Sequence, residues 1–137
     1  MELELMIKKS PINGSLKIRR VPKTCSEHTL QSQCIEWFRL QYPSLLKHLF
    51  AVPNARKCDY KTANYLRKEG VLSGVADCFL AVPCGDLHGV FIEFKVGNNK
   101  QTVTQRDFEI AMISLNYQYW IIKDFDNFIN SINNYLK

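Results

Sequence analysis

Three charged residues lie in or beside two apolar stretches, and their types and spacing suit metal-dependent hydrolysis. Glu93 and Lys95 stand inside the apolar run VFIEFKV at 90–96, and Asp77 opens the run DCFLAV at 77–82. Successive side chains on a strand alternate between faces, so Glu93 and Lys95 point the same way, roughly 7 Å apart. The two runs are predicted to pair as an antiparallel hairpin, which brings Asp77 close to both charged side chains.

Two acids and a lysine at one end of a sheet can bind a metal ion and activate water. Two carboxylates that lie close together repel each other unless a cation lies between them. Oxygen ligands suit Mg²⁺ or Mn²⁺, and such a metal activates water and neutralises charge on a phosphate. A lysine beside them can orient the water and stabilise the oxyanion. The alternative is an exposed salt bridge between Glu93 and Lys95, with Asp77 as a turn residue. The preceding Gly74-Val75-Ala76, the hairpin and the apolar surroundings favour the metal site.

Hydrophobic periodicity predicts the elements that position these residues. Ser26 can cap a helix that runs to about residue 41, with an apolar stripe at helical spacing formed by Leu30, Cys34, Trp37 and Phe38. The remaining expected elements are strand 48–52, helix 59–69 ended by Gly70, strands 77–82 and 90–96, helix 102–116, strand 117–122 and a last helix capped by Asp124.

This order of elements predicts an α/β fold in which helices flank a mixed central β-sheet. The path from strand 90–96 through helix 102–116 to strand 117–122 is a β-α-β crossover, so these two strands are expected to be parallel. Trp37 and Trp120 fall on apolar positions and are interpreted as core residues.

Charge and composition set limits on the partner. The chain has 137 residues, which suits one domain, and its net charge is +5. Residues 1–23 hold six lysines and arginines against two glutamates, and a second basic cluster comprises Arg56, Lys57, Lys61, Arg67 and Lys68. Basic clusters favour a polyanion partner, and a solvated basic surface is the alternative. We expect residues 1–24 to be a basic arm or hairpin and residues 25–137 to form the folded domain.

The compartment follows from the cysteines and from apolar runs. The five cysteines include no CxxC pair, so reduced thiols in a cytoplasmic protein are expected. No run of about eighteen apolar residues occurs, so no membrane-spanning helix is expected. The start, MELELMIKKS, is acidic where a signal peptide is basic, so secretion is not expected either.

Asp77 followed by Glu93-Phe94-Lys95 resembles the D…ExK signature of the PD-(D/E)xK nuclease superfamily. Over about residues 25–137 the chain resembles, more narrowly, a stand-alone VRR-NUC domain of the phage and bacterial type. The matching stretches are SEHTLQ, AVPNARK, EGVLSGVADCFLAVP and VFIEFKVGNNKQTVTQRDF. The chain departs from the family pattern at Ala76, where proline is usual, and at Ala55, where glycine often follows the asparagine.

The resemblance implies a restriction-endonuclease-like fold and a set of catalytic roles. Asp77 and Glu93 would bind Mg²⁺ (or Mn²⁺) together with the backbone carbonyl of Phe94, and Lys95 would position the attacking water. The implied activity is a metal-dependent endonuclease that hydrolyses DNA phosphodiester bonds.

Two further residues match the family pattern and also have simpler interpretations. Glu27 matches the family's N-terminal acid and would reach the metal, but an acid in the first turn of a helix also favours the helix dipole. Glu36, in the middle of that helix, is the rival acid. Gln105 matches the family's glutamine, but Thr102-x-x-Gln105 is also a capping box.

The resemblance also implies DNA as partner and a homodimer, because stand-alone members are similar to dimeric Holliday-junction resolvases. Branched DNA is therefore the expected substrate, in a bacterial or phage-infected cell. A nonspecific or flap-directed nuclease, a catalytically idle DNA-binding module and a protein-interaction adaptor are the alternatives. The residues expected to contact DNA are Asn54, Arg56, Lys57, Lys61 and Lys100.

Overall fold

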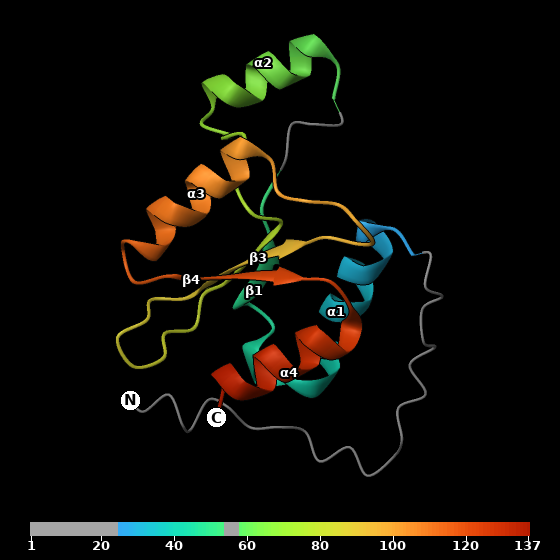
Figure 1. The fold of residues 1–137 in the computed structure, drawn as a ribbon, viewed down its shortest axis with the longest axis vertical. Coiled ribbons are helices and arrows are strands. Elements are labelled where there is room, and N and C mark those ends of the chain that lie inside the picture. The colour runs from blue at the N-terminus through green and yellow to red at the C-terminus, as the bar shows by residue number, and fades with distance from the viewer. Residues whose placement is uncertain (1–24, 54–57) are drawn as a thin grey trace. The chain divides into compact units, whose positions relative to one another are not determined.

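The computed structural model describes residues 25–53 and 58–137. The predicted arm or hairpin at 1–24 lies outside these residues, as do Asn54, Arg56 and Lys57. The chain, drawn in Figure 1, divides into two compact units. Unit 1 comprises the described residues up to Leu49 together with Phe94–Asn99 and Ile122–Lys137, and unit 2 comprises Phe50–Glu93 and Lys100–Ile121.

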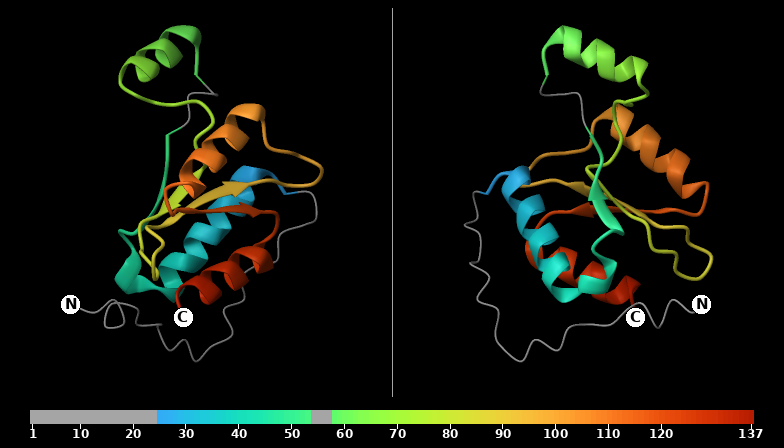
Figure 2. Two further views of the ribbon diagram at one scale, coloured as in Figure 1. Left: turned by 60° about the vertical axis from the view of Figure 1, so that its left-hand side comes forward. Right: turned by 180° about the vertical axis from the view of Figure 1, so that it is seen from behind.

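Unit 1 is built on two helices, α1 (Glu27–Gln41) and α4 (Phe125–Tyr135), which lie side by side in both views of Figure 2. The predicted caps are confirmed, because the side chain of Ser26 accepts a hydrogen bond from the first turn of α1 and that of Asp124 does so for α4. The predicted apolar stripe of α1 is buried in full: Leu30, Cys34, Trp37 and Phe38.

Trp37 lies in the core of unit 1. Its ring meets those of Tyr42, Phe125 and Phe128 edge to face, with centroids 6.0, 6.5 and 6.0 Å away. Phe94 lies 6.2 Å from Phe128 and is fully buried, so this residue points into the helices as predicted. The interpretation of Trp37 as a core residue rather than a base-stacking group is confirmed.

Tyr42 ends α1, just before the 3₁₀ helix η2 (Pro43–Leu45), and its buried hydroxyl donates a hydrogen bond of 2.7 Å to Oδ1 of Asn133. Burial raises the pKa of this phenol above its ordinary value. A raised folded-state pKa stabilises the fold fully below the unfolded pKa near 10, and this contribution is lost as pH rises further.

We expect Tyr42→Phe to lower the free energy of unfolding by about 1–2 kcal/mol, because it leaves the Asn133 oxygen without its donor. Urea denaturation at pH 8 and at pH 11 measures this effect. Because phenylalanine has no proton to lose, the difference between variant and wild type should shrink at the higher pH. An equal difference at both pH values would contradict the assignment.

Four strands form one sheet in the order β1-β2-β3-β4. Strands β2 (Cys78–Leu80) and β3 (Val90–Phe94) are antiparallel. Strand β3 is parallel to β4 (Gln118–Ile122), because the N–H of Gln118 donates to the carbonyl of Gly89 and, further along both strands, the N–H of Lys95 donates to that of Ile122. The predicted hairpin, the crossover and the mixed sheet are therefore confirmed. The remaining strand is β1 (Leu49–Ala51).

The strands β2 and β3 are shorter than the predicted ranges 77–82 and 90–96. Asp77 still takes part in the sheet, since its carbonyl accepts a hydrogen bond of 2.8 Å from the N–H of Val52, but the regular ladder with β3 begins at Cys78. Pro83 has no N–H and cannot extend the ladder at the other end.

Unit 2 contains two helices, α2 (Tyr60–Lys68) and α3 (Val103–Ile113). Asp59 caps α2, and Gly70, with φ of 100°, follows its end as predicted. Helix α3 ends at Ile113, three residues before the predicted end at 116, and Leu115 beyond it is 59% exposed. None of the helices in the described residues is long and apolar enough to cross a membrane.

Candidate active site

The register of the β2–β3 hairpin brings the two predicted metal ligands together. Cys78 pairs with Ile92, and the pairing continues to Leu80 opposite Val90. Asp77 immediately precedes this ladder, and Glu93 follows Ile92 on the partner strand. The two residues therefore lie at the same end of the hairpin, and the binding of one metal by both carboxylates stays a prediction.

The charges of both carboxylates affect the pKa of the Cys78 thiol. Cys78 is fully buried, and its pKa is raised to about 12, first by burial and then by the charges of Asp77 and Glu93. Since both charges act on one buried sulfur, the two carboxylates share one electrostatic environment. A thiol with so high a pKa stays protonated, so Cys78 has no nucleophilic role.

Two side chains hold the carboxylate of Glu93 in place. Glu93 is only 2% exposed. Its Oε1 accepts a hydrogen bond of 2.6 Å from Nε2 of Gln105, and its Oε2 accepts one of 3.2 Å from the hydroxyl of Tyr119. Hydrogen bonds to an ionised acceptor are among the strong ones, so these donors orient the carboxylate and stabilise its charge. A buried, oriented carboxylate differs from the exposed salt bridge that was the alternative interpretation.

Gln105 forms the predicted capping box and also contacts Glu93, and its role in catalysis stays a prediction. Its Oε1 accepts a hydrogen bond of 2.9 Å from the N–H of Thr102, and its N–H donates to Oγ1 of Thr102, which completes a capping box at the start of α3. Its Nε2 remains free of that box and reaches Glu93. The start of α3 is thus fixed to the carboxylate through one buried side chain.

We expect Gln105→Ala to cost about 2–3 kcal/mol of unfolding free energy, because it removes half of the cap and a donor to a buried carboxylate. Thr102→Ala is the matched control, since it removes only the cap and should cost about 1 kcal/mol. Urea denaturation of the two variants gives the comparison. Equal costs would mean that the bond to Glu93 contributes nothing to stability.

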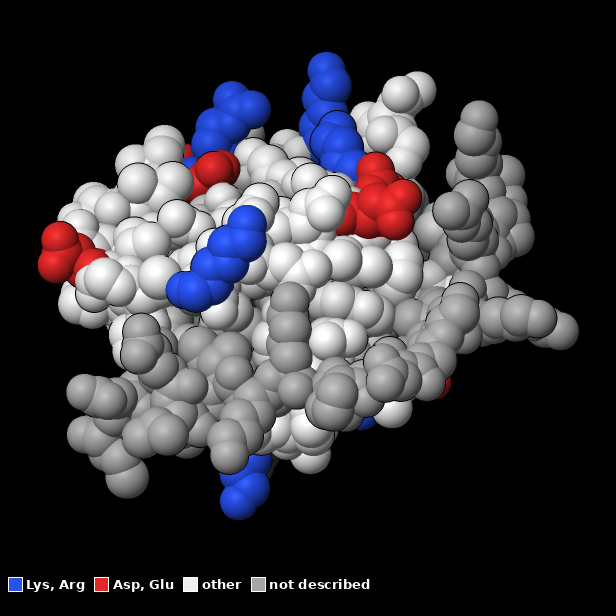
Figure 3. Space-filling view, turned by 90° about the horizontal axis from the view of Figure 1, so that it is seen from below, with Lys and Arg blue, Asp and Glu red and all other residues white. Residues whose placement is uncertain are grey.

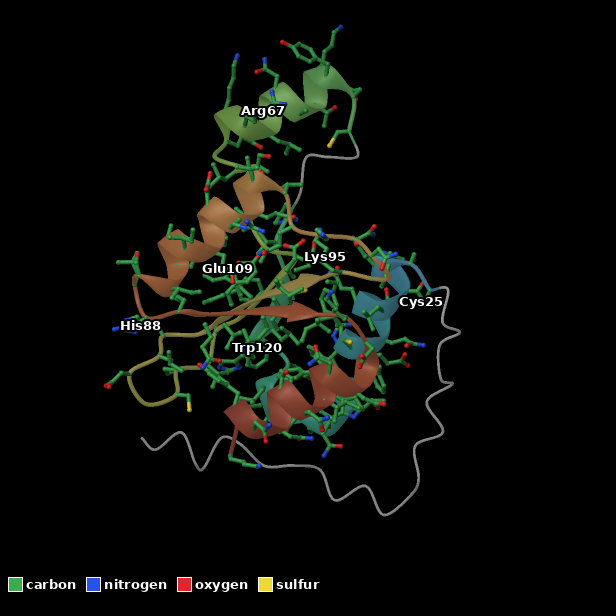
Figure 4. All side chains as sticks on the ribbon, in the orientation of Figure 1. Cys25, Arg67, His88, Lys95, Glu109 and Trp120 are labelled. Carbon is green, nitrogen blue, oxygen red and sulfur yellow. The ribbon has the colours of Figure 1, made fainter. Side chains whose placement is uncertain are left out.

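Tyr119 is the site residue that sequence reasoning missed. It lies on β4, which the sequence predicted only as a closing strand. Burial first, and the charge of Glu93 second, raise the pKa of its phenol well above the ordinary value. Its neighbours Gln101 and Glu109 (labelled in Figure 4) are joined to each other by a hydrogen bond of 2.8 Å. The sequence offers no signal that singles out this tyrosine from the other residues of its strand.

A glycine sets how closely the segment before Asp77 approaches α3. Gly74 is buried, with φ of 90°, and a Cβ at this position would lie 2.6 Å from the carbonyl oxygen of Thr104. The start of α3 therefore packs directly on the backbone three residues before Asp77. This contact explains physically why the stretch Gly74-Val75-Ala76-Asp77 begins with glycine.

Two other predicted residues, Lys95 and Glu27, lie in unit 1. Lys95 (labelled in Figure 4) is only 6% exposed, and its N–H donates to the carbonyl of Ile122. Glu27 lies in the first turn of α1, half-buried, and accepts a hydrogen bond of 2.9 Å from Nδ2 of Asn99. Its rival Glu36 is exposed.

The donor set of unit 2 fits a magnesium ion. Among the described residues, no group of three or more His, Cys, Asp and Glu side chains is placed to hold a metal. Asp77 and Glu93 supply two carboxylates, and Mg²⁺ is commonly bound by one or two carboxylates with waters and substrate oxygens completing its shell. The carbonyl of Phe94, the further ligand that the resemblance implies, belongs to unit 1 and stays a prediction.

The predicted DNA contacts are only partly within the described chain. Lys61 and Lys100 are exposed. The described residues hold ten lysines and arginines against eleven aspartates and glutamates, so the net positive charge of the chain comes from residues 1–24 and 54–57. On the face drawn in Figure 3, acidic and basic side chains of the described residues lie among uncharged ones, without a continuous basic patch.

Comparison with known proteins supports the fold. No family model matches the sequence, and no significant match to a curated protein is found. The chain is similar to the solved structure of a VRR_NUC domain protein, with 24% sequence identity and a TM-score of 0.71, over 83% of this chain and 90% of the other. At this identity the likeness establishes the fold: the chain has the restriction-endonuclease-like fold that the sequence predicted.

Proposed function

We propose that the chain is a metal-dependent endonuclease that hydrolyses phosphodiester bonds of DNA and selects branched DNA such as Holliday junctions. The observation that supports this most is the position of Asp77 and Glu93 at the same end of the β2–β3 hairpin, with Glu93 buried and held by Gln105 and Tyr119. The similarity of the fold to a VRR_NUC domain protein points in the same direction.

In this proposal Asp77, Glu93 and the carbonyl of Phe94 hold Mg²⁺ or Mn²⁺. The metal, when bound, supplies an activated water and neutralises charge on the phosphate. Gln105 and Tyr119 keep the Glu93 carboxylate in one orientation, which the bound geometry requires. The roles of Lys95 in positioning water and of Glu27 as a further acid rest on the family resemblance and stay predictions. Hydrolysis proceeds without a covalent enzyme intermediate.

The DNA contacts and the homodimer are also proposals. Arg56→Ala should weaken DNA binding and reduce the salt dependence of the affinity by about one phosphate contact, and the same is expected for Lys57, Lys61 and Lys100. Asn54 has no charge, so its substitution should weaken binding without changing the salt dependence. A dimer is supported by α3, which exposes large apolar side chains on one side. Among them are Val103 and Ile110, which are 77% and 62% exposed. Sedimentation equilibrium measures the oligomeric state.

The test is a cleavage assay on a labelled four-way junction beside a linear duplex of the same sequence. Each is incubated with Mg²⁺, Mn²⁺ or EDTA, and Asp77→Asn serves as the matched control. Metal-dependent cuts in the junction alone, absent in the variant, would support the proposal. Cutting of both DNAs would favour a nonspecific or flap-directed nuclease. Tight binding without cutting by the wild type would favour the idle DNA-binding module.

A further inference from the structure

The solvent-facing side of α2 combines aromatic and basic side chains. Tyr60, Asn64 and Lys68 recur every four residues and form one row along the helix, and Lys61 and Tyr65 form the neighbouring row. All five side chains are exposed. We call this surface, with Arg67 beside the first row, the α2 outer face.

The opposite side of α2 is the less exposed one. Ala63 is buried and Leu66 is half-buried, and both lie away from the α2 outer face. The two tyrosine rings on the outer face are 79% and 65% exposed, so their size is not explained by packing within the unit. Figure 4 shows Arg67 on this helix.

The α2 outer face is electrostatically unlike the rest of the described chain. Lys61, Arg67 and Lys68 lie on it within nine residues, whereas the described residues as a whole have a slight excess of acids. The acids Asp59 and Glu69 lie at the two caps of the helix. Both carboxylate oxygens of Asp59 accept hydrogen bonds from Thr62, so this carboxylate is engaged with the helix start.

We infer that the α2 outer face binds a DNA strand with unpaired bases, one base stacking on Tyr60 and another on Tyr65, while Lys61, Arg67 and Lys68 neutralise the phosphates. Aromatic rings set in a basic surface are the means by which proteins bind single strands without sequence preference. The two tyrosines are five residues apart, which is roughly 7.5 Å along the helix axis and about 140° around it. They therefore take different bases at the two borders of the α2 outer face rather than sandwiching one.

This inference rests on the proposed function and narrows its substrate class. In a blunt duplex the faces of the bases are covered by their neighbours, whereas a flap, a fork or an opened junction presents them. The α2 outer face would therefore favour branched DNA that has an unpaired strand beside the branch over fully paired DNA. Binding through base stacking also predicts little dependence on sequence, since every base offers a face.

The test measures binding by fluorescence anisotropy in EDTA, so that it does not depend on cleavage. The probes are a labelled oligodeoxythymidine, an abasic strand of equal length and a blunt duplex. The variant Tyr60→Leu/Tyr65→Leu should weaken binding to oligodeoxythymidine about tenfold relative to duplex, because it removes both stacking surfaces. Tyr60→Phe/Tyr65→Phe keeps the rings and should bind within about twofold of wild type. Circular dichroism checks that both variants are folded.

The abasic strand keeps the phosphates and lacks the bases, so on this probe wild type and leucine variant should bind equally. The inference would be overturned if the leucine variant bound all three probes equally more weakly than wild type. It would also be overturned if wild type bound the abasic strand as tightly as oligodeoxythymidine. Neither result would contradict the nuclease proposal. A wild type that cleaves no DNA and binds none of the probes would overturn both.

Discussion

Glu93→Gln is expected to abolish DNA cleavage, with a loss of at least about a thousandfold, or about 4 kcal/mol of activation free energy. The change removes one negative charge from a carboxylate that is 2% exposed and lies at the same end of the hairpin as Asp77. Without that charge the pair binds a divalent cation poorly, and the charge of the phosphate is no longer neutralised. Single-turnover cleavage at saturating Mg²⁺ measures the loss, and isothermal titration calorimetry with Mn²⁺ measures the affinity for the metal.

The fold should survive this substitution, which makes the loss interpretable. The amide oxygen of glutamine can still accept from Nε2 of Gln105, and the amide nitrogen then faces the hydroxyl of Tyr119. A tyrosine hydroxyl can accept as well as donate, so it only has to rotate. We expect the free energy of unfolding in EDTA to change by less than about 1 kcal/mol. Near-normal cleavage by a folded Glu93→Gln protein would contradict the assignment of Glu93 as a metal ligand.

The position of Asp77 and Glu93 at one end of the hairpin could be predicted because it depends on local rules. Side chains alternate along a strand, and a short turn makes neighbouring strands antiparallel, so the end of one strand meets the start of the other. The helix caps at Ser26 and Thr102 are local in the same sense, since each involves residues within one turn. These features follow from sequence spacing alone.

Tyr119 and the contact of Gly74 could not be predicted in this way. The hydroxyl of Tyr119 reaches Glu93 across 26 residues of sequence, through the parallel pairing of β3 with β4. No local pattern distinguishes this tyrosine from an ordinary strand residue. The glycine signalled a special backbone position, but only the packing of α3 shows that its neighbour is the carbonyl of Thr104.

The second large effect is expected at this glycine, which lies outside the proposed ligand set. Gly74→Ala should destabilise the protein by about 3 kcal/mol or more and reduce cleavage strongly. An added Cβ would lie 2.6 Å from the carbonyl oxygen of Thr104 and 2.7 Å from its carbonyl carbon, and backbone cannot move aside as a flexible side chain can. Relief requires α3 to shift, and Gln105, the next residue, holds Glu93.

Gly70→Ala is the control that separates backbone strain at positive φ from the steric contact with Thr104. Gly70 has φ of 100°, close to the 90° of Gly74, but a Cβ there meets nothing within 4 Å. Both substitutions share the cost of a side chain at positive φ, about 1–2 kcal/mol. The difference between their unfolding free energies in urea therefore measures the contact with Thr104, and the difference between their cleavage rates measures how far that contact positions Glu93. Equal stability and equal cleavage in the two variants would mean that the start of α3 can move without disturbing the carboxylate pair, and that the glycine is needed for its backbone conformation alone.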